Sequence, residues 1–286
     1  MADRAIGLCL GLELGRAMSQ RPSDALKIEP LLIPGVVDTI LKTGTIGAED
    51  LVTAWLRCLP PSGGEQPSQT AVVLGLRRSG RGPGMALQMA ASTCLRPTVD
   101  PPLLRSLPIA VATIGRGLML RTWTRRAVMT THRDPVSLLL GFAVARLAQD
   151  LLINGDLELS LARTTQALRE DAPESVIRTL RPLEFGQAVP GGEDAAAVVQ
   201  AAVHSLSTAQ SWDEAIAQAA SRTLPGDQAL VLTGALAGAR FGAGSVRGKL
   251  QPRLESLAES QAGGLLAHAL DHRQDPLPPL ARTTRT

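Results

Sequence analysis

The sequence predicts an all-α protein, and three observations carry the prediction. Hydrophobic residues make up 44% of the chain, but aromatic residues make up only 2% and tyrosine is absent, so Ala, Leu, Val and Ile must fill the core. Ala and Leu favour helices, whereas strands favour β-branched and aromatic residues. Apolar residues recur at helical spacing, and no segment shows the period-two alternation of a half-buried strand. We therefore expect one compact helical bundle over residues 1–274 and a flexible tail over residues 275–286.

The expected helices follow one another with turns between them. Asp134-Pro135 predicts the capped start of a long helix, and Asn154-Gly155 predicts its end. Pro60-Pro61 ends a helix that begins near residue 48. Further helices are expected over residues 5–18, 37–42, 83–91, 108–126, 157–170, 174–180, 193–206, 212–222, 231–241 and 250–272. Residues 60–69 and the glycine-rich residues 75–84 are expected as turns.

Charge and cysteine content exclude several classes of protein. The net charge of +3 is too small to indicate a nucleic-acid-binding protein. Three cysteines without metal-like spacing predict reduced thiols in a cytoplasmic protein. Two apolar stretches, residues 5–14 and 136–153, resemble a signal segment and a membrane span, but each contains charged residues. Because a charge at the centre of a bilayer costs about 2.5–3.5 kcal/mol, we expect both to be buried helices without a membrane role.

Two helices carry glycine at every fourth position. Gly7, Gly11 and Gly15 form one stripe, and Gly234, Gly238 and Gly242 form the other. Each glycine inside a helix costs about 0.8–1 kcal/mol relative to alanine, so a stripe of them requires a packing reason. We expect both stripes to lie where another helix approaches closely.

Three stretches, in the same order along the chain, carry a resemblance to a known family. AIGLCLGLELG over residues 5–15 is similar to a helix that ends in Gly-Asp-Ala-Leu-Gly. MTTHRDP over residues 129–135 is similar to a Thr-His-x-Asp-Pro pattern that opens a helix, and residues 104–112 partly match a Met-Arg-x-x-Pro segment. Residues 211–242 contain a helix, an acidic turn and a glycine-striped helix in register. The chain thus resembles a degenerate member of the ADP-ribosylglycohydrolase family, which includes ADP-ribosyl-[dinitrogen reductase] hydrolase and crystallin J1.

The resemblance implies an all-α fold and a site for two divalent cations, usually magnesium. In the family these ions hold the ribose diol of ADP-ribose, and a carboxylate helps to activate water at the anomeric carbon. Magnesium prefers hard oxygen ligands in octahedral geometry. The resemblance places these ligands in an Asp-Asp-Thr turn near the N-terminus and in an Asp-x-Asp-Thr turn near the C-terminus.

The C-terminal turn has lost most of its ligands in this chain. Residues 226–230 read Gly-Asp-Gln-Ala-Leu, so Asp227 matches the first aspartate. Ala229 stands where the second aspartate belongs, and Leu230 stands where the threonine belongs. Neither replacement can coordinate a cation.

The N-terminal turn is degraded in either of two alignments. Counting back from the helix over residues 37–42 places the turn at 28–30, with Glu29 as its acid, and we favour this alignment. The other places it at 37–39, with Asp38 as its acid. The Gly-Asp-Ala pattern reads Gly-Leu-Glu here, and the acid at Glu13 is shifted by one position, which is about 100° around a helix. The remaining candidate metal ligands are therefore Asp227 with Glu13, Glu29 or Asp38.

Other residues are candidates for binding rather than for metal coordination. His132 lies in the Thr-His pattern and could contact a ligand, cap a helix or belong to the core. Arg77 and Arg81 lie in a glycine-rich segment that could hold a phosphate at the next helix start, or form an ordinary turn. Three arginines, Arg121, Arg125 and Arg126, could form a surface for a protein partner or a solvated helix face.

The loss of ligands leads to three functional hypotheses. The first is a pseudoenzyme without a cofactor that serves as a binding or scaffold protein. The second is an active ADP-ribosyl hydrolase with a reduced or rebuilt magnesium site. The third is a protein that binds ADP-ribose or a related nucleotide without turning it over.

Overall fold

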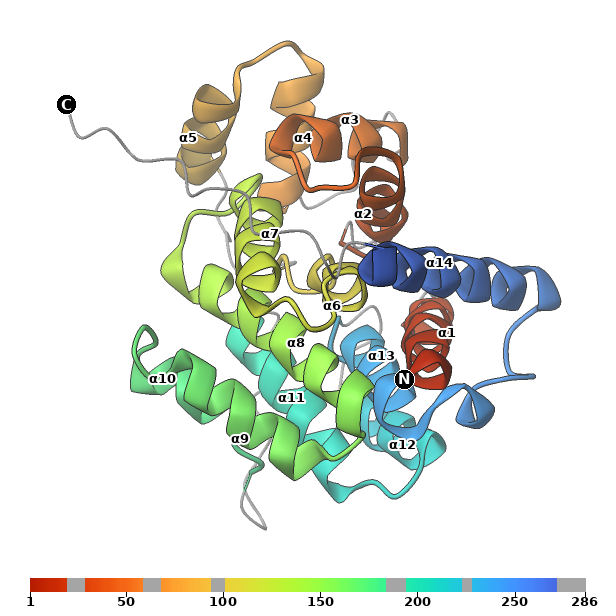
Figure 1. The fold of residues 1–286 in the computed structure, drawn as a ribbon. Helices are drawn as coiled ribbons and strands as arrows, with labels where there is room; N and C mark the ends of the chain where they lie inside the picture. Colours follow the sequence, from red (N-terminus) through yellow and green to blue (C-terminus); the bar gives the residue numbers. More distant parts are fainter. Residues whose placement is uncertain (20–28, 59–67, 94–100, 184–193, 223–227, 272–286) are drawn as a thin grey trace.

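Two helices from opposite ends of the chain, α1 and α13, pack side by side, and α8, α11, α12 and α14 contact this pair (Figure 1). The computed structural model describes residues 1–19, 29–58, 68–93, 101–183, 194–222 and 228–271. Within these ranges the chain forms 14 α-helices, one short 3-10 helix and no strand. The predicted all-α fold class is therefore confirmed. The expected boundary between domain and tail, at residues 274 and 275, lies outside the described residues.

The helices have the following bounds: α1 (Ala2–Ser19), α2 (Glu29–Thr43), α3 (Ala48–Cys58), α4 (Gln69–Arg78), α5 (Pro83–Thr93), α6 (Ser106–Ala112), α7 (Gly117–Met129), α8 (Pro135–Asn154), α9 (Leu157–Leu168), α10 (Glu174–Thr179), α11 (Ala195–Thr208), α12 (Trp212–Arg222), α13 (Gln228–Phe241), η1 (Ala243–Ser245) and α14 (Pro252–Asp271).

The two glycine stripes face each other and bring the backbones of α1 and α13 into contact. A methyl group added at Gly234 would lie 2.5 Å from the carbonyl oxygen of Gly11. A methyl group added at Gly238 would overlap the carbonyl oxygen of Gly7. At Gly15 the nearest atom is the Cα of Val231, at 3.0 Å from the added methyl. The helices are therefore antiparallel, and the end of α1 meets the start of α13.

A tryptophan closes one flank of this contact. The indole Nε1 of Trp212, the first residue of α12, donates a hydrogen bond to the carbonyl oxygen of Gly234 at 3.0 Å. The same Nε1 would lie 3.2 Å from a methyl group added at Gly11. The side chain of Trp212 thus covers the groove that the glycines leave, and its indole N–H is satisfied by a backbone carbonyl oxygen.

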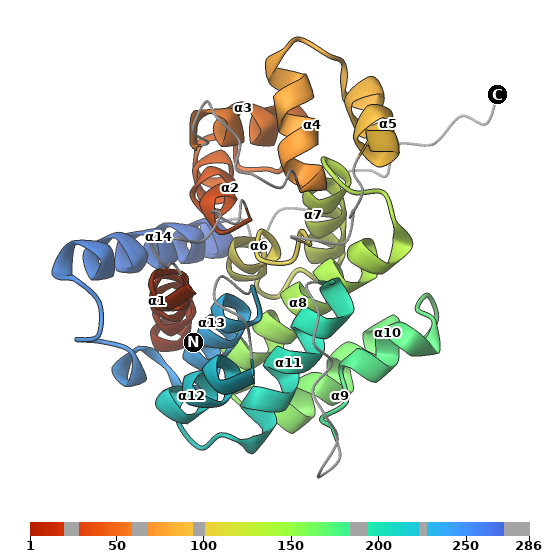
Figure 2. The same ribbon diagram turned by 180° about the vertical axis from the view of Figure 1, so that it is seen from behind.

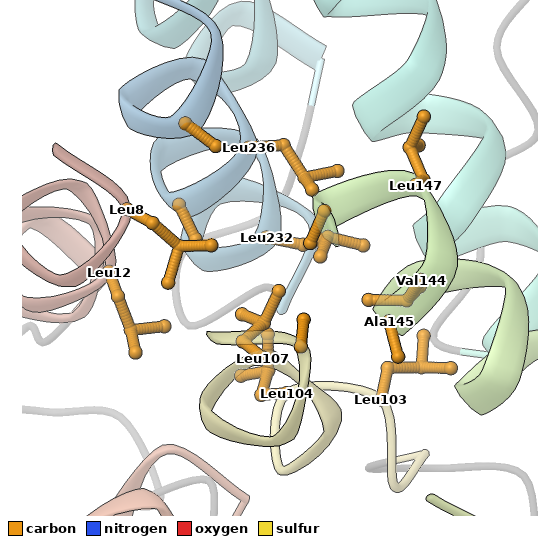
Figure 3. Close-up of a cluster of buried hydrophobic side chains, with 14 of the residues drawn as sticks. Leu8, Leu12, Leu103, Leu104, Leu107, Val144, Ala145, Leu147, Leu232 and Leu236 are labelled. Atoms are coloured by element: carbon orange, nitrogen blue, oxygen red, sulfur yellow. The ribbon is translucent and has the colours of Figure 1, made fainter. Parts of the chain in front are cut away.

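The main core lies between this pair, α6 and α8. Leu8 and Leu12 of α1 point toward Leu232 and Leu236 of α13, and side chains of α8 and of residues 103–107 complete the cluster (Figure 3). Most of these residues are leucines, valines or alanines, as the composition predicts. Aliphatic burial of this kind contributes about 25 cal/mol per Å² of apolar surface removed from water.

The central helix α8 begins and ends as the sequence predicts. The side chain of Asp134 accepts a hydrogen bond from the backbone N–H of Ser137, and Pro135 occupies the first turn. Gly155 ends the helix with a φ of 74°, a left-handed conformation that favours glycine. Among the described helices, only α8 is long and apolar enough to cross a membrane, and 72% of its most apolar window is buried inside the fold.

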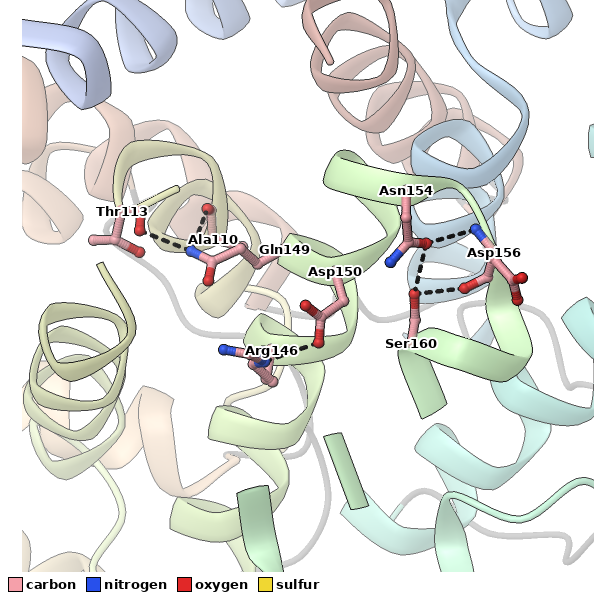
Figure 4. A network of polar contacts seen from close by, with 8 residues as sticks. All are labelled: Ala110, Thr113, Arg146, Gln149, Asp150, Asn154, Asp156 and Ser160. Carbon is pink, nitrogen blue, oxygen red and sulfur yellow. Dashed lines mark hydrogen bonds and ion pairs between the residues drawn. The ribbon is translucent and has the colours of Figure 1, made fainter. Parts of the chain in front are cut away.

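The polar side chains of α8 form hydrogen bonds and ion pairs with other groups of the protein (Figure 4). Gln149 Nε2 donates to the carbonyl oxygen of Thr113 at 2.8 Å and so links α8 to the end of α6. Arg146 Nε donates to the buried carboxylate of Asp150 at 2.8 Å, one turn along the same helix. These side chains therefore satisfy each other, or the backbone, inside an otherwise apolar helix.

Two expected elements differ from the structure. The helix expected over residues 108–126 is two helices, α6 and α7, because Gly115 adopts a φ of 81° and breaks the run between them. The glycine-rich segment expected as a turn from residue 75 is helical as far as Arg78, the end of α4. Helix α5 packs back on α4 over a small separate core of Val73, Ala86, Leu87 and Ala90 (Figure 2).

The contact between α1 and α13 can be tested with alanine at its closest point. Gly238→Ala should destabilise the protein by about 1–3 kcal/mol or more, because the added methyl group meets backbone that cannot turn away. The matched control is Gly263→Ala in α14, where a methyl group meets no atom within 4 Å. The control should gain up to about 1 kcal/mol from helix propensity. Chemical denaturation of both variants measures the difference, and equal stabilities would show that the glycine stripes are not in contact.

Candidate ligand-binding site

The packing of α1 on α13 brings together two of the segments that the resemblance assigns to the metal site. Glu13 lies on α1, two residues before Gly15, which contacts the first turns of α13 at Leu230 and Val231. The side chain of Glu13 is 5% exposed and forms an ion pair with Arg16 at 2.7 Å, one turn along α1. Its negative charge is thus already countered within the same helix.

At the start of α13 the structure replaces oxygen ligands with core residues. Asp227 lies outside the described residues, and α13 begins at Gln228. Ala229 is 1% exposed and Leu230 is 7% exposed, and both belong to the main apolar core. These two positions therefore contribute to packing.

Helix α2 contains residues from both alignments of the N-terminal turn. Glu29, the acid of the favoured alignment, is the first residue of α2, and its side chain lies outside the description. Residues 37–39, where the alternative alignment places the turn, lie in the middle of α2. Asp38 is half-exposed and pairs with Lys42 at 2.7 Å, one turn along the helix.

The described residues form no cluster of metal ligands at the positions expected to hold magnesium. No group of three or more His, Cys, Asp or Glu side chains that could hold a metal gathers among the residues that the structure describes. Glu13 is engaged by Arg16, Asp38 by Lys42, and two expected ligand positions are apolar. Two dications would repel each other strongly without several carboxylates between them.

A second group of polar residues is arranged around one buried arginine. Arg105 precedes α6 and is fully buried. Its Nη1 donates to the carbonyl oxygen of Ala127 at 3.1 Å and to Thr131 Oγ1 at 2.8 Å. Its Nη2 donates to Thr70 Oγ1 at 3.3 Å, and its guanidinium carbon lies 4.6 Å from the centre of the Trp55 ring. One cation thus ties α3, α4 and α7 together.

His132 belongs to the same polar cluster, which consists of Gln69, Thr70, Arg105, Thr131 and His132. The ring of His132 is buried, and its Nδ1 lies 2.9 Å from Thr131 Oγ1. Gln69 Nε2 donates to the carbonyl oxygen of Thr131 at 2.8 Å. Of the roles considered for His132, the structure places it in the core, directly before the cap of α8.

A pocket of about 640 Å³ opens beside this polar cluster. Gln69 of the cluster, and Arg133 and Asp134 from the turn before α8, form one wall. The opposite wall comes from α10 and from the start of α11. The lining combines apolar side chains with a few polar ones, as is typical of pockets for small molecules.

In the glycine-rich segment, the guanidinium of Arg77 contacts other groups of this chain. The guanidinium of Arg77 pairs with Glu49 of α3 and also donates to the carbonyl oxygen of Arg81 at 2.9 Å. A methyl group added at Gly80, Gly82 or Gly84 would meet no atom within 4 Å, so these glycines border open space. Arg77 therefore fastens the α4–α5 turn to α3.

Two of the three arginines expected on a partner surface are used within this chain. Arg121 pairs with Asp171 and lies over the ring of Phe142 at 5.6 Å. Arg126 donates to the carbonyl oxygen of Ile46 at 3.4 Å. Arg125 is exposed, and its Nε lies 3.3 Å from the sulfur of Met129 on the same helix. A partner surface built on these residues would thus depend mainly on Arg125.

The sequence interpretation did not assign a role to Gln69 or Thr70, and it included Arg105 and Thr131 only as parts of the segments 104–112 and 129–135 that carry the resemblance. One signal was available, since Arg105 interrupts the apolar run over residues 101–112. A charged residue in such a run is almost never fully buried unless it is paired. The partners of Arg105 come from three separate segments, α3, α4 and the end of α7, so the sequence does not indicate them.

Comparisons with known proteins agree with this architecture. A family model described as ADP-ribosylglycohydrolase matches residues 36–276. A solved structure of an "ADP-ribosylglycohydrolase-related protein complex" is similar with a TM-score of 0.73 and 19% identity, and the match covers 94% of this chain and 98% of that chain. At this identity the structural match shows the fold alone. No curated protein sequence matches the chain.

The role of Arg105 can be tested by removing its charge. Arg105→Met should destabilise the protein by about 2–4 kcal/mol, because the buried oxygens of Ala127 and Thr131 lose a charged donor. The control is Arg125→Met on the exposed face of α7, which should change stability by less than about 0.5 kcal/mol. Urea denaturation measures both values. A variant at position 105 as stable as the control would mean that the cluster does not hold the helices together.

Proposed function

The chain belongs to the ADP-ribosylglycohydrolase family, and from this premise we propose that it is a catalytically inactive member that acts by binding a ligand or partner. The alternative within the family is hydrolysis with a reduced or rebuilt magnesium site. The two proposals differ in whether the residues at the expected metal-site positions coordinate magnesium. These positions lie at the start of α13 and beside it on α1.

The observation that carries the proposal is the burial of Ala229 and Leu230 in the apolar core. The resemblance assigns an aspartate and a threonine to these positions. A methyl group and an isobutyl group offer no lone pair to magnesium, which requires hard oxygen ligands. Their burial supports a packing role that replaces coordination.

The state of Glu13 supports the same proposal. Its carboxylate accepts two hydrogen bonds from Arg16, at 2.9 Å from Nε and at 2.7 Å from Nη2. Both bonds go to the same oxygen, Oε2, so a metal ion at this carboxylate would compete with a charge-assisted pair to arginine. Glu13 is thus better suited to fix the end of α1 than to hold a cation.

The pocket beside the polar cluster supports retained binding. Its volume of about 640 Å³ falls within the range of small-molecule sites. Its polar lining consists of the cation Arg133, the carboxylates of Asp134 and Asp194, which cap α8 and α11, the hydroxyls of Ser137 and Ser175, and the amide of Gln69. ADP-ribose is the natural probe for this pocket, because the family acts on ADP-ribosyl groups.

The absence of catalysis is tested by an assay for release of ADP-ribose from modified arginine, serine and small-molecule conjugates. We expect no magnesium-dependent turnover, and an active family hydrolase serves as the positive control. Turnover that is lost on chelation, and lost again in Asp227→Ala, would overturn the proposal in favour of an active hydrolase.

Repair of the C-terminal turn provides a second test. The double variant Ala229→Asp with Leu230→Thr should remain inactive, because the N-terminal turn is degraded independently. Weak binding of one magnesium ion, measured by calorimetry, is compatible with this expectation. Activity of the repaired variant would show that the N-terminal segment still supplies its ligands.

Retained binding is tested by thermal shift with ADP-ribose in the presence of a chelator. A ligand at 100 times its dissociation constant stabilises a protein by about 2.7 kcal/mol. Val136→Trp should abolish the shift, since Val136 lines the pocket and is 41% exposed. Leu159→Trp, equally exposed on the first turn of α9, should not. No shift with the native protein would remove ADP-ribose as a ligand.

A further inference from the structure

We propose that Arg105 acts through Thr131 to hold His132 as the neutral imidazole that carries its proton on Nε2, and that this relay positions one wall of the pocket. Arg105 and Thr131 are then positioning residues, since neither lines the pocket itself. The tautomer follows from the hydrogen bonds of the ligand-free protein and does not rest on the proposed function.

The direction of the relay follows from what each group can donate. A guanidinium only donates, so Arg105 Nη1 takes one lone pair of Thr131 Oγ1, at 2.8 Å. The hydroxyl retains one proton, and His132 Nδ1 lies 2.9 Å away. Among the described residues, Thr131 Oγ1 has no other partner within hydrogen-bond distance. The proton therefore points at Nδ1, which must accept it.

The other two states of the ring are disfavoured by the same contacts. A proton on Nδ1 would point at the hydroxyl, whose own proton would then be buried without an acceptor, at a cost of about 1–3 kcal/mol. A charged imidazolium would share this hydroxyl with a second cation. Burial lowers the pKa of Arg105 to about 9, which leaves the guanidinium protonated at neutral pH. Two such cations repel strongly in a buried site.

The relay fixes the turn that separates α7 from α8. Thr131 is held through both of its oxygens, because its carbonyl accepts from Gln69 and its hydroxyl bonds Arg105 and His132. The next two residues, Arg133 and Asp134, line the pocket together with Gln69. The ring of His132 offers only a donor at Nε2, so any group that it meets there must be an acceptor such as an oxygen.

The tautomer can be read directly by NMR. Long-range ¹H–¹⁵N correlation spectra distinguish a protonated ring nitrogen from an unprotonated one, and the signals of His132 are assigned by their loss in His132→Gln. We expect the native, ligand-free protein to show a proton on Nε2 and a bare Nδ1. A proton on Nδ1, or a doubly protonated ring at neutral pH, would overturn the proposal.

Substitutions at residue 131 separate the relay from simple packing. Thr131→Val keeps the shape but removes the hydroxyl, so His132 should lose its single tautomer. Thr131→Ser retains the hydroxyl and should retain the tautomer even if the lost methyl group lowers stability. Thr130→Val is the control, since the hydroxyl of Thr130 donates to the carbonyl oxygen of Arg126 instead. An unchanged tautomer in Thr131→Val would show that the hydroxyl does not set it.

The positioning of the pocket wall is tested by ADP-ribose affinity, and this part rests on the proposed function. Thr131→Val should weaken binding about threefold to tenfold, the change in equilibrium constant that one hydrogen bond carries, while Thr131→Ser should restore it. Equal affinities for native protein and Thr131→Val would overturn the positioning role. A native protein that does not bind ADP-ribose contradicts the proposed function, and the NMR result then decides the relay by itself.

Discussion

The contact between α1 and α13, made without side chains, is the constraint on which the rest of the structure depends. Glycine at every fourth position on both helices lets the backbones touch, and alanine at these positions would not fit. Because the helices are antiparallel, the contact sets the end of α1 against the start of α13. This packing places Gly15, near the end of α1, against Leu230 and Val231 at the start of α13.

The two sides of the candidate site differ in their chemistry. On the side of α13, positions expected to carry oxygen have become part of the apolar core, at Ala229 and Leu230. On the side of α7 and α8, a charged and fully buried arginine is surrounded by carbonyl and hydroxyl oxygens. A buried cation costs free energy unless its hydrogen bonds are satisfied, and Arg105 satisfies several with groups from distant segments. The start of α13 is thus apolar at these two positions, whereas the region around Arg105 is polar and hydrogen-bonded within the protein.

Local signals in the sequence predicted the fold well. Asp134, Pro135 and Gly155 mark the ends of α8 as predicted, because caps and turn residues act through bonds only a few positions apart. The glycine stripes predicted a close helix contact correctly, although not which helices meet. The break at Gly115 was missed because the apolar pattern continues through it, and only the φ of 81° reveals the turn. Helix α4 was missed because its glycine and arginines resemble a turn by composition.

The site was less accessible from the sequence, for a physical reason. The expected metal turns could be compared with the family pattern by residue type alone, whereas the positions of Glu29 at the start of α2 and of Asp38 in its middle came from the structure. Arg105 could not be assigned a role, since its partners at Thr70, Ala127 and Thr131 are brought to it only by tertiary packing.

The glycine contact also has a consequence for how the chain folds. Gly7 meets the backbone of Gly238 and Gly242, so the first helix finds its main partner only after more than two hundred residues have been synthesised. Contacts between segments so far apart in the sequence close late and slow folding. Until then the apolar face of α1 remains unburied on the nascent chain, where such surfaces promote aggregation. Loss of the segment after residue 228 should thus affect the N-terminus first.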